Sequence, residues 1–387
     1  MDPFADIRPY NDSEVPAVLK KLLVDKELVV ALASLQLGKW HKYLTWLIYP
    51  LIRFFLRREL KGVQTVEDFQ HIMKKYMDGM IESTTTSFTV SGLEKLDPSK
   101  PYLFMSNHRD ITLDPALITY ALYHNGHDTV RIAIGDNLLS KPYVSDLMRI
   151  NKSFIVKRSA KGPRQILAAY KMLSAYIRHS IEEDGNPIWI AQREGRAKDG
   201  VDRTQPAIIK MLAMSQDKKT ESFSDYINKL HIVPLSISYE LDPCDSAKAN
   251  ELYELDAHGS YQKAEHEDAA SIAKGIAGKK GNVHVSFGTP IEGDFNDADE
   301  VAAAIDRQVI ENYVLHPTNF FAYKLLNGDY PAGVYSAQHL PFKSGQLVNE
   351  ERAFNTRIDA LPAAHRKYAL GIYANAIDSK RLFSSAD

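Results

Sequence analysis

From Tyr102 to Pro115 the chain reads YLFMSNHRDITLDP. The apolar run Tyr102–Met105 is typical of a buried strand, and polar residues follow it directly. Helical spacing resumes at Ala116, so His108 lies at a strand-to-helix junction. A neutral imidazole there, with the carboxylate of Asp114 six positions later, predicts a general base with an orienting partner. The alternative is a local hydrogen bond or a helix cap.

A protein-kinase catalytic loop is excluded, although His108-Arg109-Asp110 spells its first three letters. That loop requires Asn five residues after its Asp, and Pro115 stands there. No Asp-Phe-Gly triplet occurs in the sequence, and no two glycines are separated by a single residue, so the glycine-rich loop is absent as well.

Composition describes an ordinary globular protein. The 387 residues are 44% hydrophobic and 25% charged, and a net charge of −2 gives no general argument for nucleic-acid binding. The single cysteine, Cys244, excludes an internal disulfide and suits a reducing compartment. No signal peptide is visible at the N-terminus, so we expect a cytoplasmic protein.

One apolar segment, Tyr43–Leu56, reads YLTWLIYPLIRFFL and has basic residues on both sides. As a helix it would reach roughly 21 Å, short of the roughly 30 Å hydrocarbon core of a bilayer. Arg53 also disfavours a span. We expect a helix that lies in the lipid interface, where Trp40, Trp46 and Tyr49 are favourable. The alternative is an amphipathic helix buried against the main domain.

The remaining pattern predicts an α/β fold. The region from Ser13 to Leu37 has helical spacing, and from Thr84 onwards short β-type runs alternate with helical ones. The strand candidates are Ser87–Val90, Tyr102–Met105, Val130–Ile134, Ser153–Val156, Ile188–Ala191, Ile232–Tyr239 and Val283–Phe287. The helix candidates are Ala116–Tyr123, Leu138–Met148, Gln165–Ile181, Ala207–Met214, Lys263–Ile276, Asp299–Tyr313 and the chain from about Asn349.

We therefore expect a central mixed sheet of about seven strands flanked by helices, with an N-terminal helical region and a C-terminal helical extension. The predicted domains are 1–80 (helical, at the membrane interface), 81–315 (α/β) and 316–387 (helical extension).

Two further groups of residues follow predicted strands, and Pro234 interrupts a third strand candidate. Lys157 and Arg158 precede a helix start, a combination that favours an anion site. In Gln192–Arg196, Gly195 permits close backbone approach and Arg196 offers a fork for phosphate. Pro234 suggests an edge strand or a strand start. A solvated basic turn and a surface salt-bridge cluster are the alternatives for the first two. Ligands of open α/β sheets gather at the carboxyl ends of strands, where the first two groups and His108 are predicted to lie.

These groups in order resemble the four motif blocks of the glycerolipid acyltransferase family. The blocks are Asn107-His108 followed by an Asp, then Ser153–Arg158, Arg193–Arg196 and Val233–Leu235, and the segment Val283–Ile291 resembles the strand that closes the family's domain. The resemblance covers roughly Thr84 to Tyr313.

The first and third blocks depart from the family pattern. Five residues rather than four separate His108 from Asp114, so either Asp114 or Asp110 is the partner. We expect Asp114, because it stands at the foot of the following helix, as the family's Asp does. The third block lacks the Thr or Ser that many relatives have before the Arg, which bears on the identity of the acceptor.

The resemblance implies transfer of an acyl group from acyl-CoA or acyl carrier protein to a hydroxyl of a glycerol-phosphate-type acceptor. That acceptor would be 1-acylglycerol 3-phosphate, or alternatively glycerol 3-phosphate or a lyso-aminolipid. His108 and Asp114 would be catalytic, and the implied substrate-binding residues are Asn107, Lys157, Arg158, Arg193, Glu194, Gly195, Arg196 and Pro234. No metal or cofactor is implied beyond the acyl donor.

The expected partners are the two substrates and the inner face of a membrane, without nucleic acid. A non-catalytic peripheral lipid-binding protein is the alternative. A serine hydrolase is excluded, because no two glycines stand four apart as Gly-x-Ser-x-Gly requires.

Overall fold

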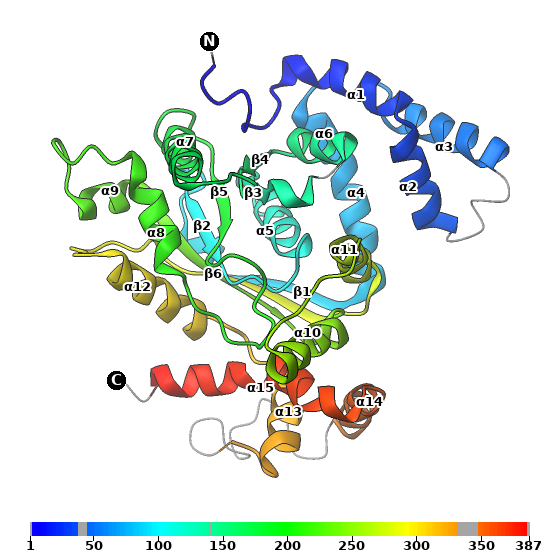
Figure 1. The fold of residues 1–387 in the computed structure, drawn as a ribbon, viewed down its shortest axis with the longest axis vertical. Helices are drawn as coiled ribbons and strands as arrows, with labels where there is room; N and C mark the ends of the chain where they lie inside the picture. Colours follow the sequence, from blue (N-terminus) through cyan, green and yellow to red (C-terminus); the bar gives the residue numbers. More distant parts are fainter. Residues whose placement is uncertain (1, 38–44, 140, 332–346, 385–387) are drawn as a thin grey trace. The chain divides into compact units, whose positions relative to one another are not determined.

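The computed structural model describes residues 2–37, 45–139, 141–331 and 347–384. One mixed sheet contains seven strands in the order β1-β7-β6-β2-β5-β3-β4, and helices flank it, so the predicted fold class is confirmed (Figure 1). The strands are β1 (Thr85–Ser91), β2 (Leu103–Ser106), β3 (Arg131–Gly135), β4 (Ser153–Val156), β5 (Ile188–Ala191), β6 (Ile232–Tyr239) and β7 (Gly281–Phe287). Every strand candidate of the sequence corresponds to one of them.

The chain forms two compact units. The first combines Met1–Gly79 with Val130–Ile188, and the second combines Met80–Thr129 with Trp189–Asp387. The three domains predicted above were divided where the residue pattern of the sequence changes, and that division stays a prediction.

The first unit contains most of the N-terminal helices. Its elements besides β3 and β4 are η1 (Asp12–Glu14), α1 (Val15–Val24), α2 (Lys26–Leu37), α3 (Thr45–Glu59), most of α4 (Val66–Thr84), η4 (Asp136–Leu138), α6 (Pro142–Ile150) and α7 (Pro163–Glu182). The helical pattern of Ser13–Leu37 is interrupted at Asp25, whose backbone is extended. Its carboxylate accepts a hydrogen bond from Leu28 N at 2.9 Å and so caps α2.

Helix α3 covers most of the apolar segment expected at a membrane, and the remainder of that segment, with Trp40, lies outside the described residues. Ile48 and Ile52 belong to the side that packs with α2. The other side is exposed: Trp46, with 74% of its surface accessible, Leu47, Leu51, Phe54 and Phe55. None of the helices within the described ranges combines the length and apolarity needed to span a bilayer.

The second unit carries the other strands and helices. Its helices are α5 (Leu113–His124), α8 (Pro206–Leu212), α9 (Phe223–Lys229), α10 (Asp245–His258), α11 (Glu267–Ala277), α12 (Ala298–Glu311), α13 (Pro317–Asn327), α14 (Val348–Asp359) and α15 (Ala363–Ser384), with the short turns η3 (Leu93–Lys95) and η5 (Ala213–Ser215). The sequence did not predict α9, α10 or α13. Helix α12 packs on β6, and Figure 1 shows α5 on the other side of that strand.

The expectation that Pro234 marks an edge strand is wrong. Strand β6 lies between β7 and β2, and all eight of its residues are buried. The antiparallel ladder with β7 ends at the pair of Leu235 and Phe287, one residue short of Pro234. The Pro234 carbonyl accepts a hydrogen bond from Gly288 N at 2.9 Å. Proline is tolerated because its missing N–H faces the position where regular pairing has ended.

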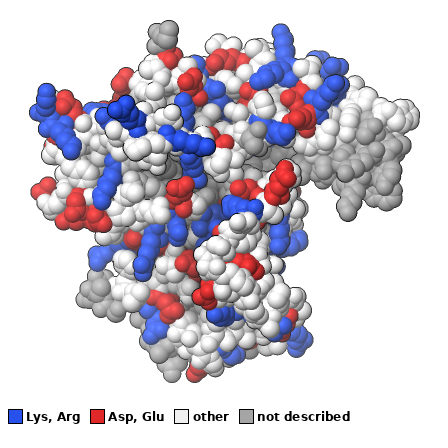
Figure 2. All heavy atoms as spheres, viewed as in Figure 1, with Lys and Arg blue, Asp and Glu red and all other residues white. Residues whose placement is uncertain are grey.

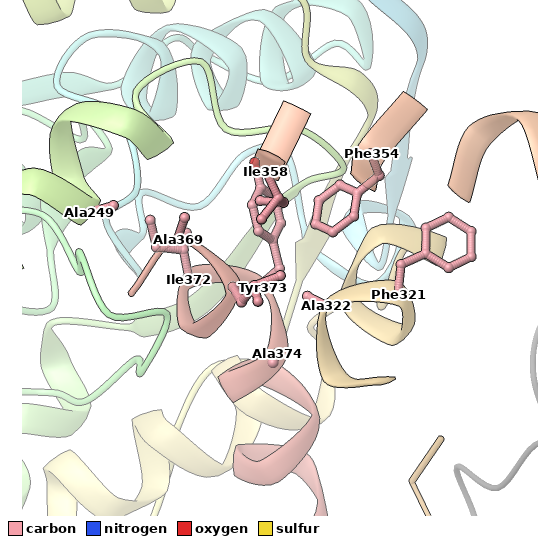
Figure 3. Packing of buried hydrophobic residues seen from close by; sticks show 10 residues of the cluster. Ala249, Phe321, Ala322, Phe354, Ile358, Ala369, Ile372, Tyr373 and Ala374 are labelled. Carbon is pink, nitrogen blue, oxygen red and sulfur yellow. The ribbon is translucent and has the colours of Figure 1, made fainter. Parts of the chain in front are cut away.

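The C-terminal extension has its own apolar core. Phe321 and Ala322 of α13, Phe354 of α14, and Ala369 and Tyr373 of α15 belong to one buried cluster, which Figure 3 shows. Because α10 contributes Ala249, the extension is joined to the rest of the second unit by apolar packing.

Charges are mixed on the face drawn in Figure 2, where Lys and Arg side chains are interspersed with Asp and Glu. This distribution agrees with the net charge of −2.

Candidate active site

The His108 side chain lies two residues beyond the carboxyl end of β2 and hydrogen-bonds to Asp114, in the first turn of α5. The distance between Nδ1 and the Asp114 Oδ2 is 2.8 Å. The Asp114 side chain is 0% exposed, whereas that of His108 is 14% exposed. With a carboxylate as its partner, Nδ1 carries the proton, so Nε2 is the basic nitrogen. Among the described residues, Nε2 has no hydrogen-bond partner.

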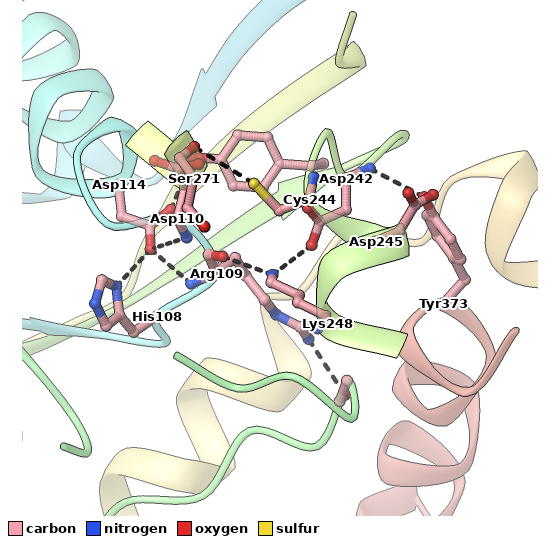
Figure 4. A network of polar contacts seen from close by, with 12 residues as sticks. His108, Arg109, Asp110, Asp114, Asp242, Cys244, Asp245, Lys248, Ser271 and Tyr373 are labelled. Atoms are coloured by element: carbon pink, nitrogen blue, oxygen red, sulfur yellow. Dashed lines mark hydrogen bonds and ion pairs between the residues drawn. The ribbon is translucent and has the colours of Figure 1, made fainter. Parts of the chain in front are cut away.

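The Asp114 carboxylate is held by three more hydrogen bonds. Oδ2 also accepts from the backbone N–H groups of Arg109, at 2.6 Å, and Asp110, at 2.9 Å (Figure 4). Oδ1 accepts from the Tyr239 hydroxyl at 2.8 Å. Burial and the neighbouring Asp114 carboxylate raise the pKa of the Tyr239 hydroxyl well above its usual value, so Tyr239 remains a donor. The carboxylate is therefore fixed before any substrate arrives.

Asp110 has a different task from Asp114. Its Oδ1 accepts hydrogen bonds from Thr112 N and Leu113 N, both at 2.9 Å, and so caps the start of α5. Burial, and then the nearby Asp114 carboxylate, raise the pKa of the Asp110 carboxyl. Of the two acids that the sequence left open, the one that bonds to His108 is Asp114.

Trp189 of β5 restricts the His108 ring. The two rings meet edge to face, with centroids 5.9 Å apart. The indole Nε1 donates to Ser106 Oγ at 2.9 Å, and Ser106 Oγ donates to the carbonyl of Asn107 at 2.7 Å. The imidazole is thus oriented by the carboxylate at Nδ1 and by the edge-to-face contact with Trp189.

Asn107, predicted to bind substrate, is fully buried and its amide bonds within the protein. Nδ2 donates to Ile237 O and to Asp202 Oδ2, both at 3.0 Å, and Oδ1 accepts from Ile237 N at 2.8 Å. Asp202 also accepts from Arg109 at 2.6 Å. Although burial lowers the pKa of the Arg109 guanidinium, the Asp202 carboxylate raises it, so the guanidinium stays charged. These contacts attach the segment that carries His108 to β6.

The loop after β5 approaches His108 through its backbone, because Ala197 N donates to His108 O at 2.7 Å. Arg196 is only 9% exposed, and no hydrogen bond or ion pair of its guanidinium occurs among the described residues. Glu194 is exposed, and Gly195 has φ +75° with open space where a side chain would begin. A buried, unpaired guanidinium is costly without an anion, which makes Arg196 a candidate anion ligand.

Arg193 belongs to the same loop and is half-buried, and in the part of the chain that the structure describes its Nε has no hydrogen-bond partner. Of the other residues predicted to bind substrate, Pro234 is buried within β6, whereas Lys157 and Arg158 belong to the first unit, where both side chains are exposed. Lys157 lies 3.8 Å from the Asp6 carboxylate, and Arg158 lies along the backbone of Gly135. Their part in binding stays a prediction.

Sequence reasoning missed Tyr239, Trp189 and Asp202. Tyr239 could have been found, because it continues the alternation of Val233 and Ile237 on one face of a buried strand, where a hydroxyl needs a partner. Nothing in the sequence indicates Trp189 or Asp202. Within the described residues, no group of three or more His, Cys, Asp or Glu side chains could hold a metal ion.

Comparison with known proteins supports the motif resemblance. Residues 87–238 match the model of the family described as Acyltransferase. Dihydroxyacetone phosphate acyltransferase of Bos taurus is 25% identical over 204 residues, and glycerol-3-phosphate acyltransferase of Pseudoalteromonas translucida is 29% identical over 193 residues. These alignments cover 52% and 49% of this chain, but only 28% and 21% of the relatives.

The solved 1-acyl-sn-glycerophosphate acyltransferase of Thermotoga maritima is 13% identical. Its TM-score is 0.38, over 77% of this chain and 94% of that chain.

Proposed function

We propose, from the premise that this chain belongs to the glycerolipid acyltransferase family, that it transfers an acyl group from a thioester donor to a hydroxyl of a glycerol-phosphate-type acceptor. The observation that carries the proposal is the hydrogen bond between His108 and the buried Asp114, which leaves Nε2 without a partner among the described residues.

In the proposed reaction, His108 Nε2 takes the proton of the acceptor hydroxyl while the hydroxyl oxygen attacks the thioester carbonyl. Asp114 stabilises the imidazolium that forms. The tetrahedral intermediate collapses, the carbon–sulfur bond breaks, and the imidazolium returns its proton to the leaving thiolate. General base catalysis of this kind contributes about 10²–10⁴-fold. For the oxyanion, we propose the backbone N–H groups of Gly195 and Arg196 as donors, because those of Glu194 and Ala197 already donate to Gln205 Oε1 and His108 O.

Arg196 is the residue that we propose for the acceptor phosphate. Its guanidinium is buried and unpaired among the described residues, and the next residue bonds to the His108 carbonyl. A planar guanidinium suits bidentate binding of phosphate oxygens. Lys157 and Arg158 remain predicted contacts to the same group, and acyl-CoA or acyl carrier protein remains the predicted donor.

Two kinds of acceptor merit a direct comparison. The motif blocks imply 1-acylglycerol 3-phosphate. The names of the matched relatives favour a smaller acceptor, glycerol 3-phosphate or dihydroxyacetone phosphate. All three carry a hydroxyl and a phosphate, so the same base and the same anion ligand would serve each of them.

We also propose that α3 attaches the chain to the surface of a membrane. Trp46, Leu47 and Phe54 are exposed, and the exposed Arg57 and Arg58 follow them in the last turn. Apolar and aromatic side chains beside basic ones suit the boundary between headgroups and acyl chains.

The test is an acyl-transfer assay on purified protein with acyl-CoA, in which each of the three acceptors is supplied separately and the release of free CoA thiol is followed. His108→Ala should retain less than a tenth of the wild-type turnover. His127→Ala, in the loop after α5, is the matched control and should remain active. A wild-type protein that transfers acyl groups to no acceptor, or an active His108→Ala, would refute the proposal.

A further inference from the structure

Lys248 of α10 lies buried behind the candidate site. Its side chain is 1% exposed. The ammonium donates to the backbone carbonyl of Arg109 at 2.7 Å and pairs with the Asp242 carboxylate (Figure 4). Burial raises the pKa of the Asp242 carboxyl, but the Lys248 ammonium, the Cys244 N–H and the Arg109 guanidinium together lower it below its usual value. The pair is therefore ionic.

The carbonyl that Lys248 contacts is one end of the peptide group that bonds to Asp114. The carbonyl of Arg109 and the N–H of Asp110 belong to the same planar unit, and that N–H donates to Asp114 Oδ2 at 2.9 Å. The positively charged ammonium, which donates to the carbonyl oxygen, polarises the peptide group and strengthens its N–H as a hydrogen-bond donor. The contacts thus run from the ammonium through one peptide group to the carboxylate, and from there to His108.

We propose that Lys248 is a positioning residue for catalysis, which fixes the peptide group between Arg109 and Asp110 and through it the Asp114 carboxylate and the His108 ring. This inference deepens the proposed function and rests on it. Lys248 itself has no direct contact with the imidazole. Its effect on the reaction is expected on turnover rather than on binding of either substrate.

The C-terminal extension keeps the partner of Lys248 in place. Arg357 of α14 donates to the carbonyl of Asp242 at 2.8 Å and to the Asp245 carboxylate at 2.6 Å. Tyr373 of α15 donates to the same carboxylate at 2.8 Å and accepts from Asp242 N at 3.1 Å. The end of β6 and the start of α10 are therefore anchored to both helices, so Lys248 projects from a fixed backbone.

The experiment compares Lys248→Met with Lys280→Met. Lys280 is a second fully buried lysine of the same unit. It donates to Thr84 Oγ1 and Gly278 O, both at 2.8 Å, but to no atom of the segment from Asn107 to Asp114. Loss of positioning should lower the kcat of Lys248→Met about 10- to 100-fold, with both KM values within about twofold. Lys280→Met should keep the wild-type kcat per folded molecule.

Two additions make the result decisive. Lys248→Met leaves Asp242 buried and unpaired, so the double variant Lys248→Met/Asp242→Asn separates folding from positioning: it should fold, yet keep the low kcat. With selective ¹⁵N-histidine labelling, the Nδ1–H resonance of His108 should shift or disappear in Lys248→Met and persist in Lys280→Met. This readout does not depend on acyl transfer, so it tests the positioning even if the proposed function fails. Wild-type kcat in the folded double variant, or an unchanged Nδ1–H resonance in Lys248→Met, would overturn the inference.

Discussion

Replacing Asp114 with Asn removes one negative charge from the candidate site while keeping the shape of the side chain. In wild-type protein, Oδ2 lies 2.8 Å from His108 Nδ1. At a charge separation of about 4 Å and an effective dielectric constant of about 20, the carboxylate stabilises an imidazolium by about 4 kcal/mol. Since about 1.4 kcal/mol corresponds to a factor of ten in rate, we expect turnover to fall about 10³-fold.

The structure should tolerate this substitution. The Asn oxygen can still accept from Arg109 N and Asp110 N, and the Tyr239 hydroxyl can rotate to accept from the new amide group. Thermal unfolding followed by circular dichroism should therefore show a folded protein, and free-CoA release should show the loss of rate.

Asp110→Asn is the matched control. Asn caps a helix about as well as Asp, and the substitution removes a buried acid whose pKa is raised. Turnover should stay within a few-fold of wild type. If Asp110→Asn were the slower of the two variants, or if Asp114→Asn kept more than a tenth of the wild-type rate, the assignment of the orienting carboxylate would be wrong.

Three further predictions concern anion binding, the membrane and pH. Arg196→Lys should raise the KM for a phosphorylated acceptor and leave the donor KM nearly unchanged, because ammonium cannot replace a bidentate guanidinium. Steady-state kinetics with each substrate varied in turn measures both values, and a rise in the donor KM alone would contradict this role. Replacing Trp46, Leu47 and Phe54 together with Ser or Gln should release the folded protein from anionic liposomes in a sedimentation assay, and retained binding would mean that the contact lies elsewhere. His316 has its pKa lowered to about 4 by burial, so the unfolded chain binds the proton first, and stability should fall as pH drops from about 6.5 towards 4. Urea unfolding at pH 7 and pH 5 should show that the free energy of unfolding falls less in His316→Gln than in the wild-type protein.

The strands were predictable from sequence because their signal is local. Apolar runs such as Tyr102–Met105 must be buried, and their ends are marked by polar residues, so each strand candidate corresponds to a strand of the sheet. Helix α10 was missed because its sequence, DSAKANELYELDAH, has almost no apolar stripe and buries Lys248 and Glu251 instead. Its position depends on ion pairs with distant residues, which no local pattern reveals.

Part of the candidate site could likewise be predicted. The approach of His108 to Asp114 follows from a short segment at the start of one helix. The contacts of Tyr239 and Trp189 with this pair arise from separate strands of the sheet, and only the tertiary structure brings them there. For Pro234 the local rule gave the wrong answer. The rule assigns proline to edge strands, but Pro234 lies in a central strand whose pairing with β7 ends at Leu235, one residue away.

The hydrogen bonds around His108 have a consequence for synthesis of the chain on the ribosome. Asn107 bonds to Ile237, 130 residues later, Asp114 to Tyr239, 125 residues later, and Arg109 to Lys248, 139 residues later. A chain grows from its N-terminus at about 5–20 residues per second, so the segment with His108 waits about 7–28 seconds for its partners. During that time the apolar strand β2 has no neighbour in β6. A nascent chain that ends before β6 therefore has an incomplete candidate site and an unpaired edge of β2, to which chaperones that bind extended apolar segments should bind in that interval.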